Sequence, residues 1–316
     1  MADLNHVTGS HGLVAVDKIG NKILFLDPFS YATLLVLEGF APRVHELAIS
    51  PDHRTAFVPI YGDGIHDDNP HPGHLIAKFD LVGRRHIADF STAPYVAPHS
   101  LRWGREGALY CVCENSGVVL RIDPERGSIL ECITVGSNNA HRIEILPDGS
   151  KLYTENEEDP FCSVVNLGSG RRIKDIPTPN GTAGIGLAPD GGTLVYTDGQ
   201  EASLLVVDTG SDDVVRTIDL TGLKQPAQIA RYSPDGQYLV VTSHEEPLGV
   251  ILTSDLSEQT LVHLGKGPMD MGFHQDGETV LVANHDEGTL AIVDLKTGSV
   301  RRTIAAGDGV EILSFY

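Results

Sequence analysis

The stretch QDGETVLVANHDEGTLAIVDLKTG, residues 275–298, contains one copy of a pattern that recurs along the 316-residue chain. It opens with the turn-like sequence Gln275-Asp276-Gly277, continues with two apolar runs, and closes the second run at the acidic residue Asp294. Val, Leu, Ile and Thr dominate both runs, which is typical of short β-strands. The pattern therefore predicts antiparallel strands joined by tight turns.

Two signals repeat with the same order and similar spacing. The apolar run that ends in an acidic or amide residue occurs seven times, at Asp27, Asp80, Asp123, Asn166, Asp208, Asp255 and Asp294. A turn signal precedes most of these runs, at Pro51-Asp52, Arg105-Glu106, Pro147-Asp148, Pro189-Asp190, Pro234-Asp235 and Gln275-Asp276. Proline fixes φ in such turns and glycine supplies a positive φ. Four short strands per repeat of roughly forty residues form one blade of a β-propeller.

The two ends of the chain predict how the ring closes. Strand-like runs occupy residues 13–16 and 23–26, and a further run occupies residues 310–316. The C-terminal run fits the first strand of a blade whose other strands lie at the N-terminus, which would leave no sheet edge open inside the ring. We therefore expect an all-β, seven-bladed β-propeller that comprises residues 1–316 as a single domain.

The segment 275–298 resembles the YVTN repeat, and through it the chain is similar to the lactonase-like seven-bladed propellers. The resemblance covers nearly the whole chain and is best in the last three blades. It implies the fold more strongly than an activity, because the repeat motif is structural. Related propellers include lactonases, a cyclic-peptide lyase, electron-transfer domains and non-catalytic binding proteins.

Composition narrows the classes of partner. The formal net charge is −20, with 43 acidic and 23 basic residues, so we expect neither nucleic acids nor anionic membranes as partners, because both are bound through clustered Lys and Arg. No apolar run is long enough to span a membrane, and we expect no signal peptide. The four cysteines show neither metal-site nor disulfide spacing. A cytoplasmic protein with a small-molecule substrate fits these features, whereas the oligomeric state is not defined by them.

Three histidines hold equivalent positions in successive blades. The residue six before each turn signal begins the predicted innermost strand, and these residues are His45, His99, His141, Ala183, Gln228 and Met269, with Val310 from the C-terminal strand. Innermost strands surround the central channel, so equivalent residues converge on its mouth. Three imidazoles suit a divalent transition metal such as Zn, Fe, Mn, Ni or Cu. We predict that His45, His99 and His141 bind this metal; the alternatives are hydrogen bonds to neighbouring blades, or one histidine as a general base.

Other polar residues are predicted on the same face. His244 and His285 occupy equivalent places in adjacent blades and, with Glu155, are candidates for proton transfer. Arg142 could stabilise an oxyanion, or it could pair with Glu46 of another blade. The insertion 61–74 adds further histidine and aspartate residues to this rim and is expected to form a flexible lid.

The combined prediction is a metal-dependent enzyme that acts on a small organic molecule at the mouth of the channel. The metal would polarise a carbonyl or activate water. Resemblance to lactonase-like propellers favours lactone or ester hydrolysis, and elimination or isomerisation could use the same site. A non-catalytic propeller that binds a ligand or a protein is the alternative, and a redox role for copper or iron is a third.

Overall fold

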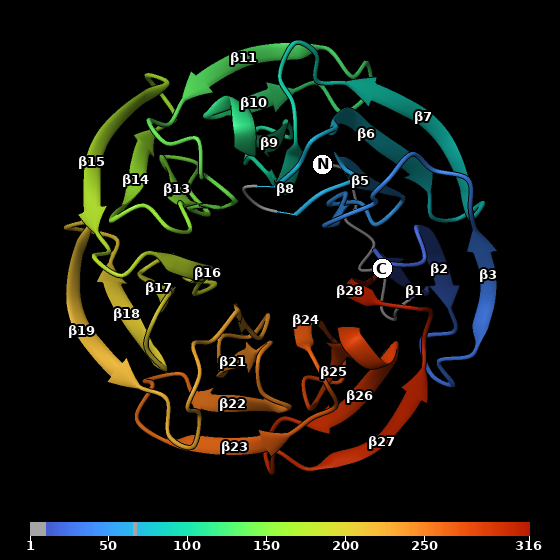
Figure 1. Cartoon of the computed structure of the whole chain (residues 1–316), viewed down its shortest axis with the longest axis vertical. Helices are drawn as coiled ribbons and strands as arrows, with labels where there is room; N and C mark the ends of the chain where they lie inside the picture. Colours follow the sequence, from blue (N-terminus) through green and yellow to red (C-terminus); the bar gives the residue numbers. More distant parts are fainter. Residues whose placement is uncertain (1–10, 66–67) are drawn as a thin grey trace, which may run out of the picture.

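The computed structural model describes residues 11–65 and 68–316. Within these ranges the regular elements are 28 β-strands and two short 3₁₀ helices, and the strands form seven four-stranded sheets. Figure 1 shows the sheets arranged as blades around a central axis. The predicted seven-bladed propeller is confirmed. No helix among the described residues has the length and apolar character needed to cross a membrane.

Each blade runs from an innermost strand at the channel to an outer strand at the rim. In order of blades 1 to 7, the innermost strands are β28 (Val310–Phe315), β4 (Ala48–Ile49), β8 (Pro98–Trp103), β12 (Arg142–Ile145), β16 (Thr182–Leu187), β20 (Ile229–Tyr232) and β24 (Pro268–Phe273). The second strands are β1 (Leu13–Asp17), β5 (Thr55–Gly62), β9 (Leu109–Cys113), β13 (Lys151–Glu155), β17 (Thr193–Asp198), β21 (Tyr238–Ser243) and β25 (Thr279–Asn284). The third strands are β2 (Lys22–Leu26), β6 (Pro72–Asp80), β10 (Val118–Ile122), β14 (Phe161–Asn166), β18 (Ser203–Asp208), β22 (Leu248–Thr253) and β26 (Thr289–Asp294). The outer strands are β3 (Thr33–Leu37), β7 (Arg85–Ser91), β11 (Ile129–Thr134), β15 (Arg171–Pro177), β19 (Asp213–Asp219), β23 (Gln259–His263) and β27 (Val300–Ala305). The 3₁₀ helices η1 (Glu114–Ser116) and η2 (His285–Glu287) each follow a second strand.

The repeated acidic residues have a structural explanation. In the turn after β26, the side chain of Asp294 accepts a hydrogen bond from the backbone N–H of Thr297. Asp208 and Asn166 accept equivalent bonds from Ser211 and Ser169 in their own blades. A short carboxylate or amide side chain stabilises such a turn by replacing a backbone acceptor. The repeat therefore marks the link between the third and outer strands.

Apolar residues alternate along the strands and fill the spaces between blades. On β1, Val14 and Val16 pack in a cluster with blade 2, whereas Leu13 and Ala15 pack in a cluster with blade 7. This alternation follows from the two-residue period of a β-strand. Within the described residues, seven such clusters lie at the seven interfaces between neighbouring blades. Each blade is consequently held by both of its neighbours.

The C-terminal strand closes the ring as predicted. Strand β28 pairs antiparallel with β1, and Leu13 and Ala15 lie opposite Phe315 and Leu313. In Figure 1 the red β28 lies beside the blue β1 and completes blade 1. Residues from both ends of the described chain thus share one sheet, which brings them to the same channel mouth.

Candidate functional site

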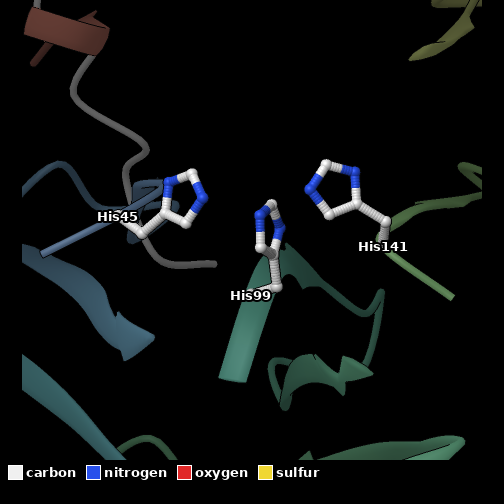
Figure 2. A group of neighbouring side chains, drawn as sticks. All are labelled: His45, His99 and His141. Atoms are coloured by element: carbon white, nitrogen blue, oxygen red, sulfur yellow. The ribbon is translucent and has the colours of Figure 1, made fainter. Parts of the chain in front are cut away.

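His45, His99 and His141 converge at the channel mouth (Figure 2). His45 precedes β4, His99 is the second residue of β8 and His141 directly precedes β12, so all three lie at or just before the start of the innermost strand of blade 2, 3 or 4. One potential ligand atom from each residue lies within 4.8 Å of the other two. The ring centroids of His99 lie 4.1 Å from His45 and 3.8 Å from His141. The predicted grouping of these three side chains is therefore present.

A cavity of about 140 Å³ adjoins the three imidazoles. Its lining comes from blades 1, 2, 3, 4, 6 and 7 and consists of Lys18, His45, Tyr61, Ile65, His99, His141, Arg142, Glu157, Gln228, Met269 and Glu311. Gln228 and Met269 hold the positions equivalent to the histidines in their own blades, which supports the alignment of the repeats. One part of the wall is consequently rich in charged and imidazole groups, and another part presents a neutral amide and a thioether.

A carboxylate faces the Nδ1 atom of two of the imidazoles. The Nδ1 atom of His45 lies 2.7 Å from Oε2 of Glu311. The Nδ1 atom of His141 lies 3.2 Å from Oε2 of Glu155 and 3.0 Å from Oε1 of Glu157. Carboxylates that contact Nδ1 orient the ring and leave Nε2 for another partner. Figure 2 shows one nitrogen of His45 and one of His141 turned toward His99.

His99 lacks such a partner. It is fully buried, and neither of its ring nitrogens has a hydrogen-bond partner among the described residues. The Oε1 atom of Glu46 lies 3.8 Å from the Nδ1 atom of His99, which is too long for a hydrogen bond. Leaving a buried polar group unsatisfied costs about 1–3 kcal/mol. A ligand bound at this position would relieve that cost, so the donor set fits a metal ion.

The protonation states differ among the three imidazoles. Burial, and then the charge of His141, holds the pKa of His99 well below its ordinary value. Burial also lowers the pKa of His45, although Glu311 opposes the shift. Burial alone would lower the pKa of His141, but Glu157 and Glu155 raise it to about 10. At neutral pH, His45 and His99 thus offer lone pairs, whereas His141 gives up a proton when it binds a metal.

Arg142 pairs with Glu46 of another blade, which is one of the two roles that the sequence predicts for Arg142. The Nε atom of Arg142 lies 3.3 Å from Oε1 of Glu46. Nη1 donates to the carbonyl oxygen of Ala183 at 2.9 Å and lies 3.1 Å from Nδ1 of His141. The Arg142 side chain is 2% exposed. Arg142 therefore links blades 2, 4 and 5 while its side chain borders the cavity.

A partly buried ion network lies further along the innermost strands. Nη2 of Arg102 is 2.7 Å from Oε1 of Glu144, and Nη1 of Arg231 is 3.5 Å from the same oxygen. Arg231 also makes a two-point contact with the carboxylate of Asp270, at 3.1 and 2.6 Å. These residues belong to the innermost strands of blades 3, 4, 6 and 7. The network ties these blades together.

The remaining predicted residues lie at different distances from the cavity. Glu155 is fully buried, and its Oε1 atom accepts hydrogen bonds from Thr182 and from the backbone of Glu157, so it positions His141. His244 and His285 share the same face, with ring centroids 6.2 Å apart. Neither of them is among the described residues that line the cavity. Their predicted role in proton transfer stays a prediction.

The blade-two insertion is more regular than expected. Residues 61–62 extend β5 and residues 72–74 extend β6, so both ends of the insertion form a long hairpin. Tyr61 and Ile65 line the cavity. The Nδ1 atom of His71 lies 2.7 Å from Asp63, and the His71 side chain is 81% exposed. His66 and Asp67, which the sequence placed on this rim, lie outside the described residues.

Two residues at the cavity were missed in the sequence. Lys18 directly follows β1, which is the position that His244 holds after β21, and Glu311 follows the first residue of β28. Alignment one residue beyond the histidine positions would have found Glu311, because Glu46 and Arg142 occupy the same place in blades 2 and 4. The innermost strand of blade 1 comes from the other end of the chain than its three partner strands, so it lies outside the regular spacing of the repeat.

The comparisons with known proteins concern the fold. No protein-family model matches the sequence, and no curated protein matches it. Among solved structures, Kuenenia stuttgartiensis hydrazine synthase is 19% identical, with a TM-score of 0.71, and the match covers 88% of this chain and 91% of that chain. The periplasmic gluconolactonase of Pseudomonas aeruginosa is 20% identical, with a TM-score of 0.77, covering 96% of this chain and 98% of that chain.

A protein of unknown function from Desulfotomaculum acetoxidans is also similar. Its identity is 11% and its TM-score 0.78, with 97% of this chain and 99% of that chain covered. At identities of 11–20%, these likenesses establish the fold alone. The fold that the resemblance to YVTN repeats implied is thus confirmed, whereas membership of that family stays a prediction.

Proposed function

We propose that this chain is a metal-dependent enzyme that acts on a small organic molecule in the cavity beside His45, His99 and His141. The observation that carries the proposal is the convergence of three buried imidazoles, one of which has both nitrogens unsatisfied within the described residues. Such a nitrogen-rich donor set suits Zn, Fe, Ni or Cu, and Mn less strongly. A bound ion of this kind would supply Lewis-acid polarisation of a carbonyl or an activated water.

The residues around the imidazoles support this assignment. Glu311 and Glu155 face the Nδ1 atoms of His45 and His141, which is the usual arrangement for carboxylates that orient metal-binding histidines. Glu157 contacts Nδ1 of His141 and also lines the cavity, so it is placed to accept a proton from a bound molecule.

Lactone or ester hydrolysis is the reaction we favour. The cavity of about 140 Å³ is well below the roughly 300–1,000 Å³ typical of sites for drug-sized ligands, so it limits the substrate to a small molecule. One similar structure is described as a gluconolactonase, and hydrolysis of this class needs an activated water and a polarised carbonyl. Elimination or isomerisation would use the same groups and would differ only in the products.

The free thiol of exposed Cys132 favours a cytoplasmic location.

A second candidate mechanism needs no metal. Glu311 and His45 form a close carboxylate–imidazole pair, which is the arrangement that orients a histidine acting as a general base. In that case His45 would take a proton directly from water or substrate. Chelation distinguishes the two mechanisms, because only the metal-dependent reaction would be lost.

The decisive experiment measures metal content by elemental analysis of untagged protein. It compares the parent with a His45→Ala/His99→Ala/His141→Ala variant and with a control, His53→Ala/His71→Ala/His86→Ala, which removes three histidines outside the cavity. We expect near-stoichiometric metal in the parent and the control, and none in the folded site variant. The loaded parent would then be assayed on small lactones and esters. A parent that fails to take up Zn, Fe, Mn, Ni or Cu would overturn the proposal and favour the general-base mechanism or a non-catalytic propeller.

A further inference from the structure

Lys18 makes a contact that bears directly on metal binding. Its Nζ atom lies 3.2 Å from Nε2 of His45 and 3.2 Å from Oε1 of Glu311. The backbone of Lys18 is held in place, because its N–H donates to the carbonyl oxygen of Gly309. The carboxylate of the preceding residue, Asp17, accepts the N–H groups of Asp308 and Gly309. Lys18 is therefore anchored beside β28 with its ammonium at the cavity wall.

The hydrogen positions at His45 follow from its two neighbours. The ammonium of Lys18 can only donate, so its contact with Nε2 requires a lone pair there and puts the ring proton of a neutral His45 on Nδ1, the atom that lies 2.7 Å from Glu311. The neutral imidazole then has its free lone pair on Nε2, and Lys18 donates to that lone pair.

A metal ion would need the same lone pair. Neutral imidazole binds metals through an unprotonated nitrogen, and at His45 this nitrogen is Nε2. An ammonium 3.2 Å from Nε2 occupies that direction and repels a divalent cation.

We propose that Lys18 is a built-in competitor for the metal site. Metal binding displaces its ammonium from Nε2 of His45, and Lys18 retains Glu311 as its partner. This inference rests on the proposed metal centre and adds a residue that sets the affinity of that centre. Lys18 acts through His45 and is a positioning residue.

The test measures Zn²⁺ affinity by competition with a chromophoric chelator at constant ionic strength. Four proteins are compared: the parent, Lys18→Met, Lys18→Arg and Lys22→Met. Lys22 is the matched control, because it belongs to the same blade and pairs with Asp308 outside the cavity lining. We expect Lys18→Met to bind Zn²⁺ roughly 10–100-fold more tightly than the parent. Lys22→Met should match the parent, and Lys18→Arg, which retains a donor, should show no gain.

Placing the same change in a metal-site variant tests whether the effect arises at this site. Adding Lys18→Met to His99→Ala should give no comparable gain, because the site is already incomplete. A second readout follows acetylation of Lys18 by mass spectrometry with and without Zn²⁺. Displacement from His45 predicts faster modification of Lys18 in the metal-bound protein and an unchanged rate at Lys22.

The outcomes separate this inference from the proposed function. If the parent binds Zn²⁺ but Lys18→Met binds it with equal or lower affinity, the metal centre stands and the competitor role of Lys18 is rejected. An unchanged acetylation rate on metal binding would reject that role as well. If none of the four proteins binds Zn²⁺, both the metal centre and the role of Lys18 are rejected.

Discussion

The Nδ1 atom of His45 lies 2.7 Å from Oε2 of Glu311, and both side chains are buried. His45 belongs to blade 2, whereas Glu311 belongs to β28, the C-terminal strand that completes blade 1. The contact exists only because β28 pairs with β1 and closes the ring. The orientation of one candidate metal ligand therefore depends on closure of the propeller.

Replacing Glu311 should weaken metal binding. Glu311→Gln keeps the size of the side chain but removes its negative charge. In the parent, that charge orients the His45 imidazole and raises its basicity. We expect Zn²⁺ affinity to fall roughly 10–100-fold, the usual effect of removing such a partner. Chelator competition measures the change, and Glu38→Gln, an exposed carboxylate next to Lys22, is the control. Equal affinities for the two variants would contradict this role for Glu311.

His99 should be dispensable for folding but not for metal binding. Because both of its buried nitrogens lack hydrogen-bond partners within the described residues, His99→Leu removes an unsatisfied polar group that costs about 1–3 kcal/mol. The metal-free variant should therefore be at least as stable as the parent in urea denaturation. Adding Zn²⁺ should raise the melting temperature of the parent and leave that of His99→Leu unchanged. A large loss of stability in the metal-free variant would refute this reading of His99.

The stability of the metal-free protein should pass through a maximum near neutral pH. The pKa values of His45 and His99 are lowered by burial, so their contribution is present above the ordinary value of 6.5 and is lost as the pH falls. The pKa of His141 is raised to about 10, where Glu157 and Glu155 outweigh the effect of burial. Its contribution is complete below pH 6.5 and is lost as the pH rises toward about 10.

Urea denaturation in the presence of chelator, from about pH 5 to about pH 10, measures this profile. The range covers the acidic side, where His45 and His99 titrate, and the alkaline side, which ends at the raised pKa of His141. His141→Gln should flatten the alkaline side of the maximum and leave the acidic side in place. An alkaline side that is identical in parent and variant would show that His141 is already neutral in the metal-free protein.

The ion network further along the innermost strands should be sensitive to the loss of one partner. Arg231→Met leaves the carboxylate of Asp270, whose side chain is 3% exposed, without its two-point contact. Breaking a fully buried pair costs about 3–5 kcal/mol of unfolding free energy, and because the Arg231 side chain is 16% exposed, we expect a loss at or below the lower end of that range. The matched control is Arg216→Met, which removes an exposed guanidinium from β19 and should change stability by less than about 0.5 kcal/mol.

A second substitution tests whether the loss comes from the unpaired charge. Arg231→Met/Asp270→Leu removes both ions and should recover much of the stability lost in the single variant. Failure of the double variant to recover would assign the effect to packing around Arg231.

The sequence alone determined the number of blades and the grouping of the histidines. The turns at Pro147-Asp148 and Pro234-Asp235 depend on residues within a few positions of each other, as the hydrogen bonds from Ser150 and Gln237 to the two aspartates show. Turn signals of this kind, some of them without the proline, occur in six of the seven blades. Once their period is known, residues at equivalent positions must meet at the channel.

Only the tertiary structure decided which side chains surround the histidines. Lys18 and Glu311 come from opposite ends of the described chain and meet at His45 because β28 joins blade 1. Arg142 links Glu46 and Ala183 across blades 2, 4 and 5. No local pattern encodes these contacts, since they depend on the rotation between neighbouring blades and on ring closure. The repeat therefore determines where the candidate ligands lie, and the closed ring determines their charges and partners.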